Sequence, residues 1–504
     1  MELLLGIDLG TTGVKLLLIN RKGKVISSNS HEYPLSSPKP GWAEQHPDIW
    51  WNATIKAIKK ITGSLNKNDE IVSVGLSGQM HGLVPLDSSI NPIRPSILWC
   101  DQRTVEECKI IENKLGKKLI DTVSNPALTG FTAPKILWLK RNEPENYKIM
   151  SHFILPKDYI RYKLTGKICT DISDASGTLL LNVKKGVWAE DIIKELGIKK
   201  SILPYIAGSE EITGYVTKTA SKLTGLKSGT PVVGGGADNT CAAVGTGIVH
   251  SGRVSSSIGS SGVVFAHTDN MLVDPETRVH TFNHSVPDNY YLMGVMLSAG
   301  LSFKWFRDNL GQKEINIEKQ TGKDAYNQLS KSAANIDPGC EGLIFLPYLN
   351  GERTPHKDPF ARGVFFGLSQ RHTREHLVRA VMEGIVYGLM DSIEIIENLG
   401  LDIKQIRATG GGGKNKFWRQ MQADVFNKPV VTLNNDEGPA YGAALLSGVG
   451  VNFYNSIEEA ADSTVKIKSI VEPDPDKHDV YSDIHRRYKE LYISLKDNFR
   501  NIRY

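Results

Sequence analysis

The sequence predicts an α/β protein of two large domains, and a strand–turn–strand pattern that occurs twice is the main observation behind this prediction. Apolar runs enter and leave the turn at Gly10–Val14 (GTTGV), and the same arrangement surrounds Gly259–Val263 (GSSGV), half a chain away. The second observation is the length, because 504 residues are too many for one hydrophobic core. We therefore expect one copy of the pattern in each of two domains, residues 1–249 and residues 250–504.

Composition and charge narrow the class of protein. The apolar fraction of 40% and the charged fraction of 23% are typical of a soluble globular protein, and a net charge of +5 gives no reason to expect nucleic acid. The five cysteines lack CxxC spacing, which favours reduced thiols in a cytoplasmic protein. Glu2 and Asp8 interrupt the apolar N-terminal run, so we expect no signal peptide, and no apolar segment reaches the ~20 residues that span a bilayer. These features predict that the protein does not contact a membrane. They do not decide whether it forms a homodimer.

The first domain reads as a sheet with helices. In chain order we expect a three-stranded meander, a helix, a buried strand ending in a polar loop, a helical insertion, and a strand running through three glycines into a small-residue helix. These elements occupy residues 1–35, 47–61, 71–76 with the loop 77–82, 121–203, and 231–236 with 240–247.

The second domain repeats the opening meander from about residue 250 and continues with alternating helices and strands. We expect a helix over 376–398, a strand over 406–409 ending in the glycine loop 410–413, and helices over 417–426 and from 438. Because strands and helices alternate while each half opens with a meander, mixed sheets are predicted. Two such halves, each with a Gly-hydroxyl turn, resemble the actin-like (ribonuclease H-like) ATPase fold, with a ligand cleft between the domains.

The two turns are suited to bind a polyphosphate. Glycines let backbone N–H groups approach an anion, and hydroxyls such as those of Thr11, Thr12 and Ser260 add donors. Two ordinary hairpins would explain either copy alone, but the repetition favours a nucleotide such as ATP held between two lobes. Lys15 follows the first turn and can reach a phosphate; a strand-edge lysine that points to water explains it equally well. Neither a Walker A sequence nor a GxGxxG fingerprint is present.

Two aspartates are candidates for the chemistry. Asp8 ends the first strand beside the turn, where a carboxylate is costly to bury unless it meets a cation, and we expect Mg²⁺ there, bound directly or through water. Asp238 lies between three glycines and a helix, so we assign it as the general base that accepts the proton of an alcohol during phosphoryl transfer. The alternative for Asp238 is a helix cap.

The polar loop after the strand at 71–76 contains Gln79, Met80 and His81. Loops at the carboxyl ends of strands bind ligands in open α/β sheets, so His81 is a candidate for a hydrogen bond to a sugar hydroxyl. A surface histidine and a methionine packed in the core are the alternatives.

Two long segments resemble the signatures of the FGGY carbohydrate kinases. The first is Gly130–Asn142, and the second is Gly363–Leu368 followed by His376–Glu383. The resemblance implies an ATP-dependent sugar kinase in which Asp238 accepts the proton, Asp8 acts at the magnesium–phosphate end, and Asn239 lies beside the sugar with Gln79, Met80 and His81. It further implies phosphate contacts from Gly10, Thr11, Thr12, Lys15, Gly259 and Ser260, and adenosine contacts from Gly410, Gly411, Gly412 and Asn415. Ser260 stands where the family commonly has threonine, and the hydroxyl is retained.

The loop Gly78–Gly82 is similar to the sugar-contacting loop of the family members that phosphorylate xylulose. This implies conversion of D-xylulose to D-xylulose 5-phosphate. A related kinase acting on another ketose, a polyol or a sugar acid (ribulose, glycerol or gluconate) stays open, although the Met80-His81 pair speaks against glycerol. An actin-like ATPase without a sugar substrate is the second alternative.

Overall fold

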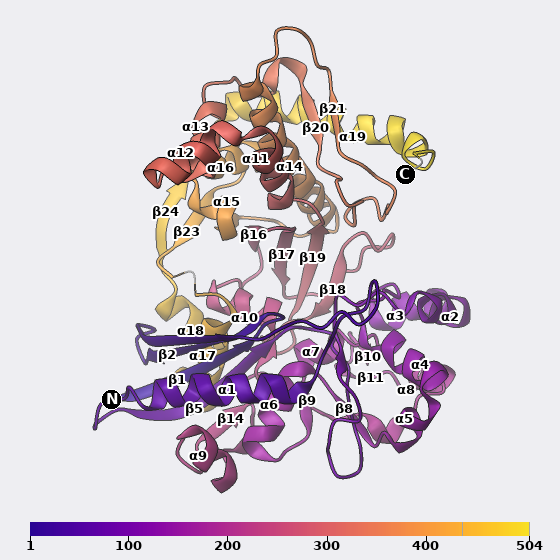
Figure 1. The fold of residues 1–504 in the computed structure, drawn as a ribbon, viewed down its shortest axis with the longest axis vertical. Helices are drawn as coiled ribbons and strands as arrows, with labels where there is room; N and C mark the ends of the chain where they lie inside the picture. Colours follow the sequence, from indigo (N-terminus) through magenta and orange to yellow (C-terminus); the bar gives the residue numbers. More distant parts are fainter. Residues whose placement is uncertain (436, 503–504) are drawn as a thin grey trace.

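Two α/β lobes, one above the other in Figure 1, form the molecule. The computed structural model describes residues 1–435 and 437–502. Each lobe contains one seven-stranded mixed sheet, and each sheet includes one copy of the repeated strand–turn–strand pattern. The predicted two-domain α/β fold is therefore confirmed.

The first sheet has the strand order β13-β14-β5-β1-β2-β3, and β15 pairs with the end of β5. The predicted meander is present, because β1, β2 and β3 pair antiparallel, while β5 and β15 run parallel to β1. The strands are β1 (Glu2–Leu9), β2 (Gly13–Asn20), β3 (Val25–Glu32), β5 (Glu70–Gly78), β13 (Ile212–Tyr215), β14 (Pro231–Val233) and β15 (Gly236–Ala237).

The central strand β1 is buried on both faces, which explains its unbroken apolar run. Leu3, Leu5 and Ile7 pack in one core cluster with the residues of α1 (Pro47–Thr62), and Leu4 packs in another with α17 (Pro439–Gly450). The helix predicted over 47–61 is therefore present and covers one face of the sheet.

The other face is covered by α17, although this helix comes from the far end of the chain. The close crossing that its small residues predict is confirmed: a Cβ at Gly6 would lie 1.8 Å from the Ala440 carbonyl oxygen, and one at Gly442 would lie 1.8 Å from the Cys241 carbonyl oxygen. Figure 1 accordingly places α17 and α18 (Ile457–Thr464) in the lower lobe, beside β1, β2 and α10 (Asp238–Gly245). The boundary between residues 249 and 250 describes chain order and stays a prediction.

The second sheet has the order β18-β19-β17-β16-β22-β23-β24, with β22 parallel to β16. Its meander runs β16-β17-β19, and β18 is added at the edge beyond β19. The strands are β16 (Arg253–Ile258), β17 (Gly262–Thr268), β18 (His280–Asn283), β19 (Tyr290–Met296), β22 (Gln405–Thr409), β23 (Val430–Leu433) and β24 (Ile467–Val471).

The helices of the second lobe bury one large core with this sheet. The predicted helices over 376–398 and 417–426 are α14 and α16. The helices are α11 (Gly300–Leu310), α12 (Gln312–Thr321), α13 (Ala325–Ala333), α14 (Arg374–Asn398), α16 (Lys416–Phe426) and α19 (Pro475–Phe499), with the hairpin β20 (Ile344–Leu346) and β21 (Val364–Phe366).

The segment between β5 and β13 forms the insertion of the first lobe. It is only partly helical over 121–203, because short two-stranded ladders interrupt the helices. The helices are α2 (Val105–Leu115), α3 (Lys117–Val123), α4 (Thr132–Asn142), α5 (Pro144–Ile149), α6 (Pro156–Thr165), α7 (Ile172–Ser176) and α8 (Glu190–Glu195), followed after β13 by α9 (Lys218–Thr224). The short strands of the insertion are β6 (Val84–Leu86), β7 (Ser96–Ile97), β8 (His152–Ile154), β9 (Cys169–Asp171), β10 (Leu181–Asn182), β11 (Val187–Trp188) and β12 (Tyr205–Ala207), and β4 (Glu44–Gln45), which precedes α1, pairs with β7.

One predicted loop is a helix. Residues Gly410–Lys414 form the short helix α15, where the sequence predicted a glycine loop. Gly410, with a positive φ of 68°, turns the chain out of β22, and a Cβ at Gly412 or Gly413 would meet Ile258 or Ala408. The glycines are therefore used for close packing as well as for the turn. Across the described part of the chain, no helix combines the length and apolar character needed to cross a bilayer.

Candidate active site

Both candidate aspartates lie at one edge of the first sheet. Asp8 is opposite Ser77 in the parallel pair β1–β5, and Ala237, the last residue of β15, is opposite Gly78. Helix α10 then begins at Asp238. Because the carboxyl ends of parallel strands meet at the same edge, the fold brings Asp8 and Asp238 to a common site facing the second lobe.

The surroundings of Asp8 and Asp238 disfavour two full negative charges. Burial raises the pKa of Asp8 to about 6, although the Ser77 hydroxyl donates a 2.9 Å hydrogen bond to its Oδ1. Burial and then the charge of Asp8 raise the pKa of Asp238 to about 7, against the 2.8 Å hydrogen bond from the Asn239 backbone N–H. The charge of Asp8 thus adds to burial in raising the pKa of Asp238.

Asp238 does not act as a helix cap. The N-cap residue of α10 is Ala237, and the carboxylate of Asp238 accepts from the N–H of the adjacent Asn239 rather than from the N–H groups one turn further on. The carboxylate therefore stays available to a ligand, and the cap alternative is not supported.

The donor set fits a divalent cation. Among residues 1–435 and 437–502, no Lys, Arg or His nitrogen lies within 4 Å of the Asp8 or Asp238 carboxylates, so neither carboxylate is neutralised by an ion pair. Asp8, whose carboxylate has no ion-pair partner among these residues, offers the oxygen ligands that Mg²⁺ prefers.

The three glycines before Asp238 are needed because the backbone passes through a crowded place. A Cβ at Gly234 would lie 2.2 Å from the Gly208 carbonyl oxygen, and a Cβ at Gly235, where φ is +71°, would lie 2.0 Å from the Leu76 carbonyl oxygen. The Gly234 carbonyl accepts a 2.5 Å hydrogen bond from the buried Arg161. Asp238 is therefore attached to a rigid segment.

A buried ionic network lies behind this segment, and sequence reasoning did not assign it a role. The Lys157 ammonium, fully buried, contacts the carboxylates of Asp158, Asp171 and Asp174 at 2.7, 2.5 and 3.1 Å. Asp171 accepts from the Ser173 hydroxyl, and the Ser173 oxygen in turn accepts from the Ala237 N–H. The network thus reaches the residue before Asp238. In the sequence, only the charged residues around α6 and α7 indicate that such a network exists.

The sugar-loop candidate His81 is held in a fixed orientation. Its φ of 68° is unusual for a residue with a Cβ, and its carbonyl accepts from Lys135 Nζ and the Thr132 hydroxyl at 2.9 and 3.0 Å. Lys135 and Thr132 belong to α4, within the segment Gly130–Asn142. That segment therefore supports the loop that carries His81.

The imidazole of His81 is neutral. Burial and the charge of Lys135 lower its pKa to about 3, and Nδ1 lies 2.6 Å from the Gly177 carbonyl oxygen. Because a carbonyl can only accept, Nδ1 carries the proton and Nε2 is left as an acceptor. The ring packs edge-on against Phe131 at 4.9 Å and near Phe282 of the second lobe at 6.3 Å. His81 is thus half-buried between the lobes rather than a surface residue.

Met80 and Gln79, which precede His81 in the sugar loop, contact different parts of the site. Met80 is only 4% exposed, and its sulfur lies 3.5 Å from the amide nitrogen of Asn239, so Met80 links the loop to the residue after Asp238. Gln79 contacts the first turn instead: its side chain accepts from the Thr11 hydroxyl at 3.2 Å. Sugar contacts by Gln79, Met80 and Asn239 stay predictions.

The two Gly-hydroxyl turns are tight and leave exposed donors. Gly10 N–H donates to the Gly13 carbonyl at 2.9 Å, and Gly259 N–H donates to the Ser261 carbonyl at 3.0 Å. Thr12, Gly259 and Ser260 are exposed. The Lys15 ammonium forms a 2.8 Å ion pair with Glu437, just before α17. A phosphate contact by Lys15 stays a prediction that requires this pair to open.

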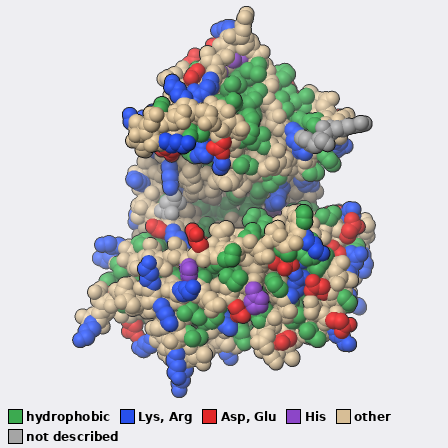
Figure 2. Space-filling view, viewed as in Figure 1, with side chains coloured by type: hydrophobic (Ala, Val, Ile, Leu, Met, Phe, Trp, Pro, Cys, Tyr) green, Lys and Arg blue, Asp and Glu red, His purple; other side chains and the backbone are tan. Residues whose placement is uncertain are grey.

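A cavity of about 400 Å³ adjoins the second turn. It includes five of the predicted nucleotide residues, Gly259, Ser260, Gly411, Gly412 and Asn415, while Gly410 lies at a neighbouring hollow. Sequence reasoning missed the residues that α11 and α13 contribute, because nothing in their spacing marks them; these are Leu301, Phe303, Lys304, Tyr326, Asn327 and Ser330. The volume and the aromatic lining suit a nucleoside. In Figure 2 the surface is hollowed between the two lobes.

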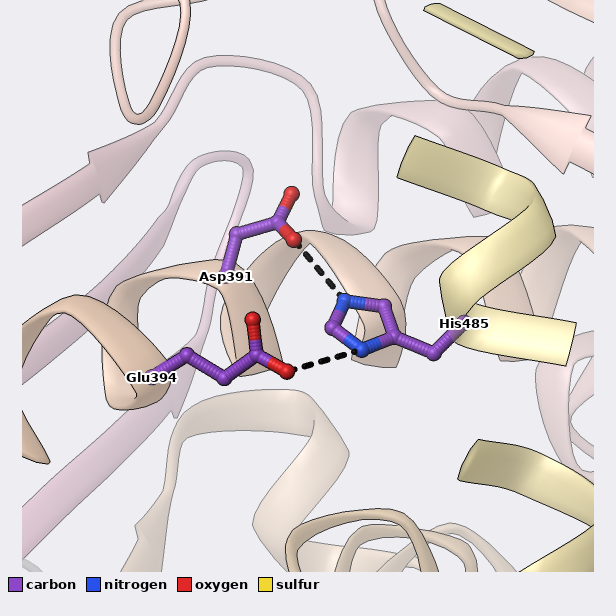
Figure 3. A group of neighbouring side chains, drawn as sticks. All are labelled: Asp391, Glu394 and His485. Atoms are coloured by element: carbon purple, nitrogen blue, oxygen red, sulfur yellow. Dashed lines mark hydrogen bonds and ion pairs between the residues drawn. The ribbon is translucent and has the colours of Figure 1, made fainter. Parts of the chain in front are cut away.

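Two other groups of carboxylates and histidine have the composition of metal sites but are already neutralised. In Figure 3 the His485 ring lies between Asp391 and Glu394, with Nε2 at 2.8 Å and Nδ1 at 3.4 Å from their oxygens. Both ring nitrogens are thus used, and the imidazolium takes the place of a cation. In the group Asp158, Asp171 and Asp174, the ammonium of Lys157 does the same.

The fold defines a class of two-lobed α/β proteins, and the candidate aspartates lie at one edge of the first sheet. Comparison with known proteins identifies the family. The FGGY family of carbohydrate kinases matches through its N-terminal domain over residues 3–245 and its C-terminal domain over residues 254–451. The chain belongs to this family.

Individual relatives are similar over nearly the whole chain. The sequence is 41% identical over 498 residues to a xylulose kinase of Bacillus subtilis (strain 168), covering 99% of this chain and 98% of that protein. It is 37% identical over 492 residues to a xylulose kinase of Escherichia coli (strain K12), covering 97% of this chain and 99% of that protein. The crystal structure of ligand-bound xylulose kinase from Lactobacillus acidophilus has a TM-score of 0.93 at 28% identity, covering 99% of this chain and 100% of that one.

Proposed function

We propose that this protein transfers the γ-phosphoryl group of ATP to D-xylulose, forming D-xylulose 5-phosphate and ADP. Family membership establishes the class of carbohydrate kinase, and the relatives named xylulose kinase support the choice of sugar. The assignment of residues to roles is our own.

Asp238 is the proposed general base. It accepts the proton of the terminal sugar hydroxyl while that oxygen attacks the γ-phosphorus; the bond from the γ-phosphorus to the bridging oxygen breaks, and ADP leaves. The observation that carries this proposal is the position of Asp238: a cleft-facing carboxylate on a rigid glycine segment, not used as a cap, with a pKa of about 7. A base is most useful when its pKa lies near the working pH.

The remaining candidates bind the substrates. We assign the turns at Gly10–Thr12 and Gly259–Ser260 to the phosphates, with Lys15 joining them, and the cavity beside Gly410–Gly412 and Asn415 to adenosine. Asp8 would hold Mg²⁺, which supplies positive charge against the phosphates. Gln79, Met80, His81 and Asn239 bind the sugar, and His81 accepts a hydrogen bond from a sugar hydroxyl at Nε2. Closure of the lobes excludes water, which would otherwise compete as the acceptor.

We place the enzyme in the cytoplasm. All five cysteines are free in the structure, four of them buried, which agrees with a reducing compartment.

A coupled assay of ADP release against a panel of sugars tests the proposal. D-xylulose is expected to give the highest kcat/KM among pentuloses, polyols and aldonic acids. A higher kcat/KM for ribulose, glycerol or gluconate would show that this compound, and not D-xylulose, is the substrate. ADP release that is independent of any sugar would favour an actin-like ATPase.

A further inference from the structure

One cation of the second lobe, Arg353, has no ion-pair partner among the residues that the structure describes. Arg353 lies in the loop between β20 and β21, and its neighbours in sequence are fixed. Glu352 Oε1 accepts from the Leu297 N–H at 2.9 Å, and Thr354 N–H donates to the Val295 carbonyl at 3.0 Å. The backbone of Arg353 is therefore fixed beside the end of β19, one strand away from the second Gly-hydroxyl turn.

The side chain of Arg353 is free. Within residues 1–435 and 437–502, its guanidinium makes no hydrogen bond and has no carboxylate within 4 Å, whereas the nearby Arg278 pairs with Asp274 at 2.8 Å. The adjacent Glu352 does not compensate it, because its carboxyl is turned toward backbone N–H groups and burial raises its pKa to about 8. An unpaired guanidinium fixed at its base is suited to meet a ligand.

The loop that carries Arg353 lies beside the aromatic residues around the sugar loop, because Thr354 binds the carbonyl of Val295, and Val295 packs in one core cluster with Phe131 and Phe282. The side chain is exposed, while desolvation by the surrounding protein lowers the pKa of the guanidinium. Its charge also helps to lower the pKa values of His81 and His280, after the larger effect of burial. His81 and His280 both pack against Phe131, with ring centroids 4.9 and 6.0 Å apart, so Arg353 stands near one shared aromatic wall.

Three groups on the sugar side of the site accept hydrogen bonds, and the amides of Gln79 and Asn239 supply only neutral donors. His81 offers an acceptor at Nε2, Asp238 offers carboxylate oxygens, and Met80 offers a thioether. A ketose also carries a carbonyl oxygen, which can only accept hydrogen bonds. A guanidinium has five N–H donors and cannot be deprotonated under working conditions.

We propose that Arg353 is the second lobe's contact with the sugar, donating hydrogen bonds to its carbonyl and hydroxyl oxygens when the lobes close, and thereby a specificity-determining residue. The identity of the sugar rests on the proposed function above. Because the contact crosses the cleft, sugar binding and lobe closure support each other.

Steady-state kinetics of Arg353→Met, Arg353→Lys and Lys357→Met test this. Lys357 is a matched control, since it is a cation of the same loop whose ammonium is bound by the Glu276 carbonyl and the Thr277 hydroxyl. Arg353→Met should raise the KM for D-xylulose about 10- to 100-fold, the loss expected for a hydrogen bond to a charged group, with the KM for ATP within twofold. Arg353→Lys should recover part of the loss, and Lys357→Met should resemble the wild type.

Three results would overturn the assignment: an unchanged sugar KM in Arg353→Met, an equal rise in the KM for both substrates, or the same rise in Lys357→Met. The panel of sugars tested with the wild-type enzyme distinguishes a wrong role for Arg353 from a wrong choice of sugar in the proposed function. If another sugar is the better substrate, the Arg353 variants are compared on that sugar, and the same three results decide.

Discussion

Asp238 and Asp8 are the residues on which the chemistry depends, and their environment makes activity depend on pH. A general base must be deprotonated, and burial together with the charge of Asp8 raises the pKa of Asp238 to about 7. We therefore expect kcat/KM for the sugar to increase as the pH rises from 5 through 7, and then to level off. A flat profile over that range would contradict Asp238 as the base.

Substitution of the same residue separates its chemical role from a structural one. Asp238→Asn keeps the shape of the side chain but removes the base, so kcat should fall by about 10²–10⁴-fold while the thermal midpoint changes little. Asp402→Asn, at an exposed aspartate paired with Lys404, should behave like the wild type. Near-normal turnover in Asp238→Asn would refute the assignment.

At the scale of elements, the site depends on how α7 meets the sugar loop. A Cβ at Gly177, the residue after α7, would lie 2.8 Å from two ring atoms of His81 and 2.9 Å from the terminal carbon of Met80. Gly177→Ala should therefore displace His81 and Met80 and raise the sugar KM at least several-fold, with little change in the KM for ATP. The matched control is Gly208→Ala, whose Cβ would meet nothing closer than 3.5 Å. Equal kinetics for both variants would show that the position of His81 does not control sugar binding.

The attachment of the last helix is a second element-scale feature, and it gives a pH-dependent stability. Burial disfavours the charged His485, but the hydrogen bonds and charges of Asp391 and Glu394 outweigh it and raise its pKa to about 9. A histidine whose pKa is raised on folding stabilises the folded state fully below its usual pKa of 6.5, and the contribution is lost as the pH rises to 9. The thermal midpoint should fall across this window.

A variant isolates this contribution. His485→Gln leaves Asp391 and Glu394 without their shared partner, which costs about 3–5 kcal/mol for a buried pair, so its midpoint at pH 6.5 should be clearly lower. It should also lose less stability between pH 6.5 and 9 than the wild type. Identical slopes would mean that His485 does not hold α19 on α14 through its charge.

For the whole molecule, the sequence predicted those features of the fold that depend on residues close together in the chain. The duplicated turns, the meander of β1–β3 and the small-residue helix α17 all have short-range signals, and each is confirmed in the structure. The glycine segment after β22 was expected to be a loop and is the short helix α15, because close packing against Ile258 and Ala408 cannot be read from glycines alone.

What the sequence could not indicate are contacts between distant segments. The return of α17 to the first sheet joins residues more than 400 positions apart, and the pairing of Lys15 with Glu437 follows from it. The residues that α11 and α13 add to the cavity near the second turn, and the position of Arg353 near His81, depend on how the elements pack. Contacts of this kind produce no periodic pattern and no characteristic spacing of residues in the sequence.

The central claim is that both turns and Asp238 face one cleft in which ATP meets the sugar, and a crystal structure with D-xylulose and a non-hydrolysable ATP analogue tests it most directly. The account predicts the polyphosphate between Gly10–Thr12 and Gly259–Ser260, and the Asp238 carboxylate about 2.6–3.2 Å from the terminal sugar hydroxyl. A nucleotide bound away from the two turns, or a sugar whose terminal hydroxyl is beyond the reach of Asp238, would contradict it.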